Sequence, residues 1–223
     1  MRINFINHFK ITIFSVVLIV FNAAQAGSYD DFFKAVKMDD AKAVQQLLSR
    51  GFDVNTIDTS GQNGLFIAIQ EPSPKVSKVL VESPKIDLNA LNIKGESPLM
   101  LAALKGQLEL ADRMVKKGAD VNKTGWTPLH YAATTGQLQL IKLLIENYAY
   151  IDAESPNGST PLMLASMYGT PEAVKLLLDE GADPTLKNQQ GLTAVQFAQR
   201  ASRPDAVELI TKAIRAKRPP GQW

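Results

Sequence analysis

Apolar residues recur along most of this chain in short blocks separated by polar stretches and glycines. Five blocks align with one another, each beginning at a glycine: residues 61–69 (GQNGLFIAI), 95–103 (GESPLMLAA), 125–133 (GWTPLHYAA), 158–166 (GSTPLMLAS) and 191–199 (GLTAVQFAQ). The leading glycines are spaced by 34, 30, 33 and 33 residues. A period near 33 residues indicates a repeat protein, in which each unit packs only on its neighbours.

A second stretch with helical periodicity follows each block. Three of these stretches cover residues 108–117, 138–147 and 172–180, and related phrases (GFDVN, GADVN, GADPT) come after second helices. We therefore expect each repeat to contain two helices joined by a tight turn and followed by a loop.

The first helices of the fourth and fifth repeats carry a start signal. Thr127 and Thr160 can accept a hydrogen bond from a free backbone N–H. Pro128 and Pro161 occupy the first helical position, where the missing N–H costs nothing. Leu129 and its equivalents then point into the core.

Small residues and glycines complete the pattern. Pairs of small residues let the first helices lie close together: Ala102 and Ala103, Ala132 and Ala133, Ala165 and Ser166. Glycines follow the helices where we expect left-handed backbone, which is cheap only for glycine. They are Gly106, Gly136 and Gly169 after first helices, and Gly51, Gly118 and Gly181 after second helices.

These features resemble the ankyrin-repeat family. The phrase GWTPLHYAATTG followed by a second helix is highly specific, and the resemblance covers residues 28–216. It implies an all-α solenoid of about six stacked helix-turn-helix repeats with β-hairpin-like finger loops. The expected domain covers residues 27–216, with repeats at about 28–60, 61–94, 95–124, 125–157, 158–190 and 191–216.

Several segments depart from the repeat pattern. The two terminal repeats lack the full TPLH phrase, as expected of caps with a polar outer face. The finger before the fourth repeat is shortened: Gly125 follows Val121 by four positions, and the equivalent separation in the other repeats is seven positions. Residues 71–75 (EPSPK) replace a glycine turn and residues 83–85 interrupt the end of a second helix, so we expect a local bend there.

Residues 1–26 have the pattern of a secretory signal peptide. A basic start with Arg2 and Lys10 precedes an apolar run over residues 11–21, and small residues lead to cleavage after Ala26. A permanent membrane anchor is the weaker alternative, since crossing takes roughly 20 apolar residues. The sequence thus predicts a periplasmic or secreted protein, with a basic, disordered tail at residues 217–223.

Charge and composition limit the partner. The chain has 24 basic and 22 acidic residues, and removing the leader leaves 22 of each. Duplex binding needs a basic excess, so nucleic acid is not the expected partner. The absence of cysteine excludes disulfides, thiolate nucleophiles and zinc–thiolate sites.

Nothing in the sequence indicates catalysis, a metal or a cofactor. His130 is the one histidine of the mature chain, and the resemblance gives it a structural role, bonded to backbone or to a neighbouring repeat. No phosphate-binding or dinucleotide motif is present. Adjacent acids such as Asp30 and Asp31 are more often helix-dipole partners than acid–base pairs. We expect a non-enzyme.

The resemblance places a protein partner on the finger tips and the exposed face of the first helices. Trp126 and Tyr168 are the leading anchors, because interface energy concentrates on exposed Trp and Tyr. Trp126 has an alternative role, covering its neighbour. The other predicted contacts are Gln62, Glu71, Glu96, Lys105, Thr134, Thr135, Met167, Lys187, Gln189 and Gln190.

Tyr148 stands where the family has glycine, and Tyr150 follows two residues later. They form either a second, convex patch or packing between neighbouring fingers.

Three hypotheses about function remain. The first is a scaffold or assembly factor that binds an exported protein, and the second is an immunity or inhibitor protein that occludes a toxin or hydrolase. An effector delivered to a host cell is the third. We expect a monomer when the chain is alone, with no stable membrane insertion after cleavage.

Overall fold

The computed structural model describes residues 27–71 and 73–216. The described residues form two compact units, which meet in the sequence between Ile86 and Asp87. The predicted signal peptide and tail lie outside the described residues. Among the helices that are described, none combines the length and apolar character needed to span a bilayer.

The first unit contains two helix pairs. A helix over residues 27–37 precedes α2 (Ala41–Ser49), and α3 (Gly64–Gln70) is followed by α4 (Pro74–Glu82). α4 packs against both α2 and α3. The two pairs correspond to the first two expected repeats.

Close packing around one phenylalanine holds the first unit together. Phe32 is fully buried, and its ring stacks on Phe52 with centroids 4.5 Å apart. A Cβ at Gly64 would lie 2.8 Å from the Phe32 ring, so a larger residue would displace it. The Asp39 carboxylate accepts a hydrogen bond from the Val76 backbone at 2.8 Å and joins the two pairs.

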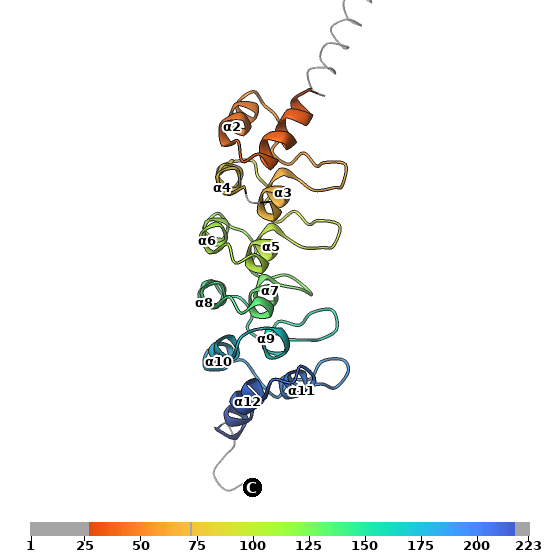
Figure 1. The fold of residues 1–223 in the computed structure, drawn as a ribbon, viewed down its shortest axis with the longest axis vertical. Helices are drawn as coiled ribbons and strands as arrows, with labels where there is room; N and C mark the ends of the chain where they lie inside the picture. Colours follow the sequence, from red (N-terminus) through yellow and green to blue (C-terminus); the bar gives the residue numbers. More distant parts are fainter. Residues whose placement is uncertain (1–26, 72, 217–223) are drawn as a thin grey trace, which may run out of the picture. The chain divides into compact units, whose positions relative to one another are not determined.

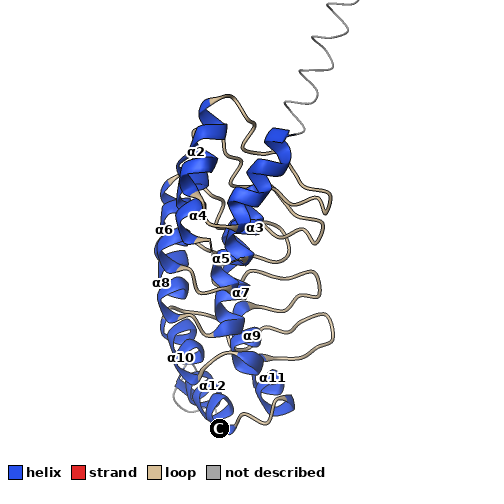
Figure 2. Cartoon of the chain, turned by 45° about the horizontal axis from the view of Figure 1, so that its top comes forward, coloured by secondary structure: helices blue, strands red, loops and turns tan. Residues whose placement is uncertain are grey.

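The second unit contains four helix pairs in two layers. The first helices lie side by side in one layer and the second helices form the other, with the finger loops projecting beyond the first helices (Figures 1 and 2). The first helices are α5 (Pro98–Leu104), α7 (Pro128–Thr135), α9 (Pro161–Tyr168) and α11 (Ala194–Arg200). The second helices are α6 (Leu108–Lys116), α8 (Leu138–Glu146), α10 (Pro171–Asp179) and α12 (Pro204–Ala216).

This arrangement is the ankyrin-repeat fold expected from the sequence. The expected leucines, Leu99, Leu129 and Leu162, are fully buried. Each such side chain contributes about 1.5–3 kcal/mol on burial. The pairs of small residues are buried as well, so adjacent first helices approach closely.

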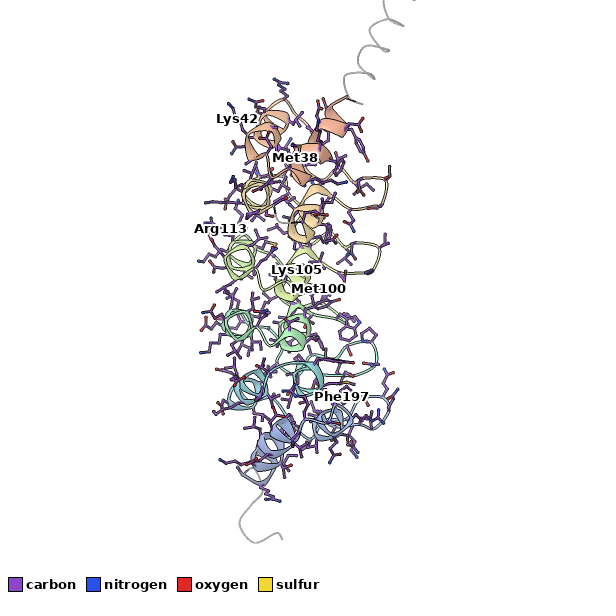
Figure 3. All side chains as sticks on the ribbon, in the orientation of Figure 1. Met38, Lys42, Met100, Lys105, Arg113 and Phe197 are labelled. Carbon is purple, nitrogen blue, oxygen red and sulfur yellow. The ribbon has the colours of Figure 1, made fainter. Side chains whose placement is uncertain are left out.

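Charged side chains lie on the other side of the second helices. Figure 3 shows Arg113 on α6 pointing away from the first helices, and its guanidinium pairs with Glu109 at 2.9 Å. This is an exposed pair within one helix, and such pairs contribute only a few tenths of a kcal/mol.

The prediction of left-handed glycines is right at five positions and wrong at Gly169. The other glycines that follow helices have φ between 69° and 103°, whereas Gly169 has φ −77°. Glycine is required there for a different reason. A Cβ at this position would lie 2.5 Å from the Ala133 carbonyl oxygen, where the end of α9 meets α7.

A row of side-chain amides and carboxylates links successive loops of the second unit. The Asn89 side chain accepts the Asp120 N–H at 2.9 Å, and Asp152 accepts the Asp183 N–H at 3.1 Å. Asn122 links the loop after α6 to the loop after α8 in the same way. Its side chain donates to the Tyr148 carbonyl and accepts from the Tyr150 N–H, each at 2.8 Å.

The two tyrosines of this loop do not pack between fingers, so that interpretation is wrong. Tyr148 is 86% exposed and Tyr150 is 70% exposed. Tyr148 also has φ 66°, the left-handed conformation that its glycine equivalents adopt. A non-glycine residue is strained there.

The finger before α7 is shorter than its neighbours, as expected (Figure 1). In the other fingers of this unit a polar residue three positions before the glycine bonds across the turn, and these residues are Asn92, Ser155 and Asn188. In the shortened finger the residue three positions before Gly125 is Asn122, and its side chain bonds to the backbone of Tyr148 and Tyr150. The bend expected near residues 71–85 stays a prediction.

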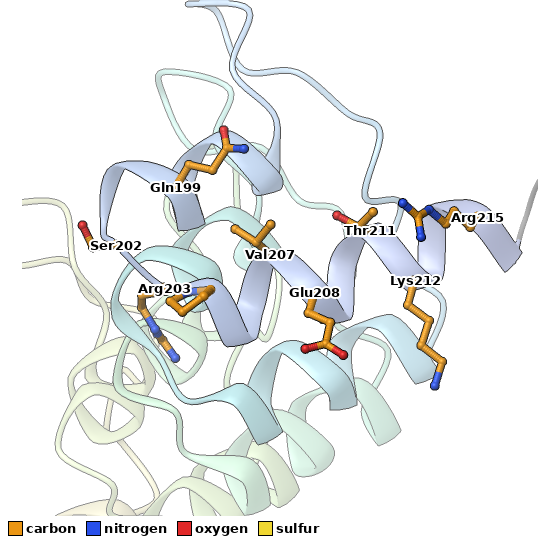
Figure 4. Close-up of a pocket in the computed structure, with 9 residues that line it drawn as sticks. Gln199, Ser202, Arg203, Val207, Glu208, Thr211, Lys212 and Arg215 are labelled. Atoms are coloured by element: carbon orange, nitrogen blue, oxygen red, sulfur yellow. The ribbon is translucent and has the colours of Figure 1, made fainter.

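The last repeat ends the unit with a polar surface. Figure 4 shows Glu208, Lys212 and Arg215 along α12, beside Ser202 and Arg203. The Arg203 guanidinium donates to the Gly169 carbonyl and so fastens the start of α12 to the end of α9. This polar face agrees with the role of a terminal cap.

Replacing Leu129 with alanine should lower the free energy of unfolding by about 2–5 kcal/mol, because it leaves a cavity in the core between repeats. The second unit should then unfold in shifted or separate steps. Urea denaturation followed by circular dichroism measures this, with Leu91→Ala, at a 52% exposed position, as the control. A single unshifted transition would contradict the stacking account.

Tyr148→Gly should raise the free energy of unfolding by about 1 kcal/mol, because it relieves the left-handed strain at a helix C-terminus. Tyr150→Gly is the matched control, since Tyr150 is not among the residues with positive φ. This variant should not raise the free energy of unfolding. Equal effects of the two variants in chemical denaturation would show that the strain at Tyr148 is negligible.

Candidate partner-binding site

A hollow of about 250 Å³ opens between α5, α7 and α9 in the second unit. It brings together residues from three repeats and one finger. The lining residues are Leu104, Trp126, His130, Tyr131, Thr134, Leu164 and Tyr168. Both leading anchors predicted from the sequence, Trp126 and Tyr168, therefore border the same hollow.

Trp126 lies at the end of the shortened finger and is partly exposed. Its ring packs edge-on against His130 and Tyr131, with centroid distances of 5.3 Å and 6.4 Å. The indole thus covers a neighbour on one side and borders the hollow on the other. Both roles considered for it are compatible with this position.

His130 holds the base of the hollow in place. Its Nδ1 accepts the Thr127 N–H at 3.1 Å, and Nε2 lies 3.0 Å from the Ser159 carbonyl oxygen of the next repeat. Because a carbonyl only accepts, Nε2 carries the proton. Burial lowers the pKa of His130 to about 4, against a partly offsetting effect of the bond to Ser159. The ring is therefore neutral near pH 7, with both nitrogens occupied.

Tyr131 and Glu96 form the polar rim. The Tyr131 hydroxyl donates to a Glu96 carboxylate oxygen at 2.9 Å, and the Asn92 side-chain amide donates to the other oxygen at 2.8 Å. Burial first, and then the Glu96 carboxylate, raise the pKa of Tyr131. Glu96, predicted as a partner contact, is thus already bonded within the protein.

Four further predicted contacts lie on these helices. Thr134 lines the hollow, and its hydroxyl donates to the His130 carbonyl at 2.7 Å. Thr135 and Lys105 are exposed at the ends of α7 and α5 (Figure 3 labels Lys105), and Met167 is partly buried beside Tyr168 on α9. Tyr168 itself is 61% exposed.

The remaining predicted contacts do not line the hollow. Gln189 packs on the preceding finger, where its amide donates to the Pro156 carbonyl at 3.0 Å. Lys187 and Gln190 are exposed on the same finger. Gln62 and Glu71 belong to the first unit.

Sequence reasoning missed three residues of the hollow: Leu104, Tyr131 and Leu164. Tyr131 could have been found, because it is aromatic at a position where the flanking repeats carry Leu101 and Leu164. The two leucines look like ordinary core residues in the sequence, and only the packing of three repeats shows that they border a hollow.

Nothing among the described residues forms a metal site: no group of three or more His, Asp or Glu side chains is arranged to hold an ion. Among the larger depressions elsewhere on the described residues, one is lined by residues of α2 and α4 and one lies beside α12. Neither brings together aromatic side chains from several repeats.

Protonation of His130 should destabilise the fold. Its pKa is near 6.5 when unfolded and about 4 when folded, so the unfolded state takes up the proton first as pH falls. The free energy of unfolding should therefore be unaffected by His130 protonation above pH 6.5, and it should fall by up to about 3 kcal/mol as the pH is lowered towards 4.

His130→Gln is the matched variant, since its amide can keep one bond but does not titrate. Urea denaturation of both proteins between about pH 7 and pH 4 should show their stability difference shrinking as pH falls. A difference that stays constant would mean that His130 does not titrate in this range.

The comparison with protein families identifies ankyrin repeats. The model for "Ankyrin repeats (3 copies)" matches residues 32–124, 84–155 and 149–218. An ankyrin-repeat domain is a protein–protein interaction module, and this fold is generally a non-catalytic scaffold.

Among curated proteins, the rat Ankyrin repeat and SAM domain-containing protein 6 is 30% identical over 98 residues, which is 42% of this chain and 11% of that protein. Alpha-latrocrustotoxin-Lt1a of Latrodectus tredecimguttatus is 34% identical over 91 residues, which is 41% of this chain and 6% of the toxin. The matched segments thus span about a tenth or less of these relatives.

Several solved structures each cover 82% of this chain. An ankyrin repeat domain from Acinetobacter baumannii has a TM-score of 0.73 at 26% identity, over 96% of its length. The ankyrin repeat protein EF0377 has a TM-score of 0.74 at 28% identity, also over 96%. One chain of the Bdellovibrio bacteriovorus complex of predatory endopeptidase Bd0816 with immunity protein Bd3460 has a TM-score of 0.70 at 29% identity, over 97%. Given its repeats, its helix pairs and the extent of the family match, this chain belongs to the ankyrin-repeat family.

Proposed function

We propose that this chain is an exported, non-catalytic binding protein whose partner is another protein. The partner contacts the face of the second unit that contains Trp126 and Tyr168. The observation that carries the proposal is their convergence: side chains from different repeats border one hollow, and both are accessible.

The chemistry of this face suits a protein surface. Aromatic side chains supply large contact areas at low cost in conformational entropy, and they dominate measured interface energies. His130 and the Tyr131–Glu96 bond fix the base and rim, so little ordering is needed on binding. The balance of 22 basic and 22 acidic residues outside the leader supports a protein partner over nucleic acid.

Export is supported by residues 1–26, with their basic start, apolar run and small residues before Ala26. The mature chain then begins at Gly27 and works in a periplasm or outside the cell, as a monomer when alone.

Binding of this chain has one of two consequences for the partner. A scaffold or assembly factor stabilises its partner and raises the partner's abundance or activity. An immunity or inhibitor protein abolishes that activity, and the similarity to a chain of the endopeptidase–immunity protein complex favours this second candidate. Assays of the partner's activity with and without this chain separate the two.

Replacing Trp126 and Tyr168 together with alanine should abolish capture of the partner. The test is a crosslinked pull-down from an extract of the exported compartment, with the chain from Gly27 onward as bait. Each truncation should weaken binding by about 1–2 kcal/mol, since both remove an aromatic anchor.

The matched control removes two exposed aromatic side chains elsewhere, Tyr148→Ala with Tyr150→Ala. A protein captured by wild type and by this control, but not by the anchor variant, supports the proposal. If wild type captures nothing, or only the control variant loses its partner, the proposed surface is wrong. Unfolding of the anchor variant would reassign Trp126 to a structural role.

A further inference from the structure

One position that lines the hollow carries side chains of different size in adjacent repeats. The seventh residue of α5, α7 and α9 is Leu104, Thr134 and Met167, respectively. Threonine is the smallest of the three, and its hydroxyl is turned back to the His130 carbonyl. Of the seven side chains that line the hollow, Thr134 is the shortest, and its equivalent Met167 is not among them.

The walls around Thr134 are apolar. Leu104 and Leu164 supply aliphatic carbon, while Trp126, Tyr131 and Tyr168 supply aromatic rings. The Tyr131 hydroxyl already donates to Glu96, and His130 Nε2 donates to the Ser159 carbonyl. No lining side chain is charged, since the low pKa of His130 keeps it neutral near pH 7. A charged group placed among these walls would lose part of its hydration, and the carboxylate on the rim, Glu96, already accepts hydrogen bonds from Tyr131 and Asn92.

The size of the hollow limits what can enter. Its volume of about 250 Å³ is below the range of roughly 300–1,000 Å³ that is usual for small-molecule and cofactor sites. It is sufficient for one large side chain. Interface hot spots are typically single aromatic or aliphatic anchors that fill such pockets.

We infer that this Thr134 socket, lined by the seven residues of the hollow, receives one large apolar side chain of the partner, of the leucine, methionine or phenylalanine type. The inference rests on the proposed function, because the side chain is supplied by the bound protein. An arginine between the aromatic rings is the rival occupant. The uncharged lining and the exposed Lys105, which follows Leu104, oppose it.

The test uses amino-acid amides as probes, so it does not depend on knowing the partner. The chain from Gly27 onward, labelled in its methyl groups, is titrated with N-acetyl-leucinamide and N-acetyl-phenylalaninamide, and with the glycine and arginine equivalents. The apolar probes should shift the methyl resonances of Leu104, Thr134 and Leu164 saturably, with a dissociation constant on the order of 1–10 mM. The glycine and arginine probes should bind at least about tenfold more weakly.

Thr134→Met fills the socket with the residue that the next repeat already carries at this position. It should weaken apolar probe binding at least about tenfold while keeping the wild-type circular dichroism spectrum. Thr59→Met makes the same change at an exposed position of the first unit and should leave probe binding unchanged. Undiminished binding by Thr134→Met, no shift at the socket methyls, or tighter binding of the arginine probe would each overturn the inference.

The socket and the proposed function can fail separately. If wild type captures a partner and Thr134→Met captures it equally well, the socket is not used and the binding function stands. If wild type captures no partner but the apolar probes bind as expected, the proposed function fails and the socket remains an apolar site.

Discussion

Close approach of neighbouring first helices is the constraint on which the rest of this structure depends. A single helix pair cannot bury its own apolar face, so each pair needs the next one. The approach is possible because the facing side chains are very small. Ala132 and Ala133 are fully buried, and Gly169 lies so close to the Ala133 carbonyl that even a methyl group would clash. The buried leucines contribute their packing energy only at this spacing.

The same spacing makes the candidate site rigid. His130 reaches the Ser159 carbonyl of the following repeat only because the repeats lie close together, and burial keeps its ring neutral. The indole of Trp126 packs edge-on against this fixed ring. A structural histidine therefore supports a surface aromatic residue. Such a surface loses little conformational entropy when a partner binds, which is the general advantage of a pre-organised interface.

One loop of the second unit follows the repeat pattern in its backbone but not in its sequence. Tyr148 adopts the left-handed conformation of its glycine equivalents, at a cost in strain. Asn122 overcomes this preference with two hydrogen bonds to the loop backbone. The neighbouring repeats and this amide thus determine the conformation against the local preference of the residue, which leaves two tyrosine rings in solvent.

The sequence by itself determined the repeat length, the helix pairs, the helix starts and the structural role of His130, because these depend on signals within one or two repeats. It also singled out Trp126 and Tyr168. Only the tertiary structure decided that these two residues border one hollow, that Glu96 is bonded to Tyr131, and that Gly169 is needed for space and not for a left-handed turn. The physical reason is that the hollow and the close contacts arise from the relative sizes of side chains in three successive repeats. No single repeat contains that information.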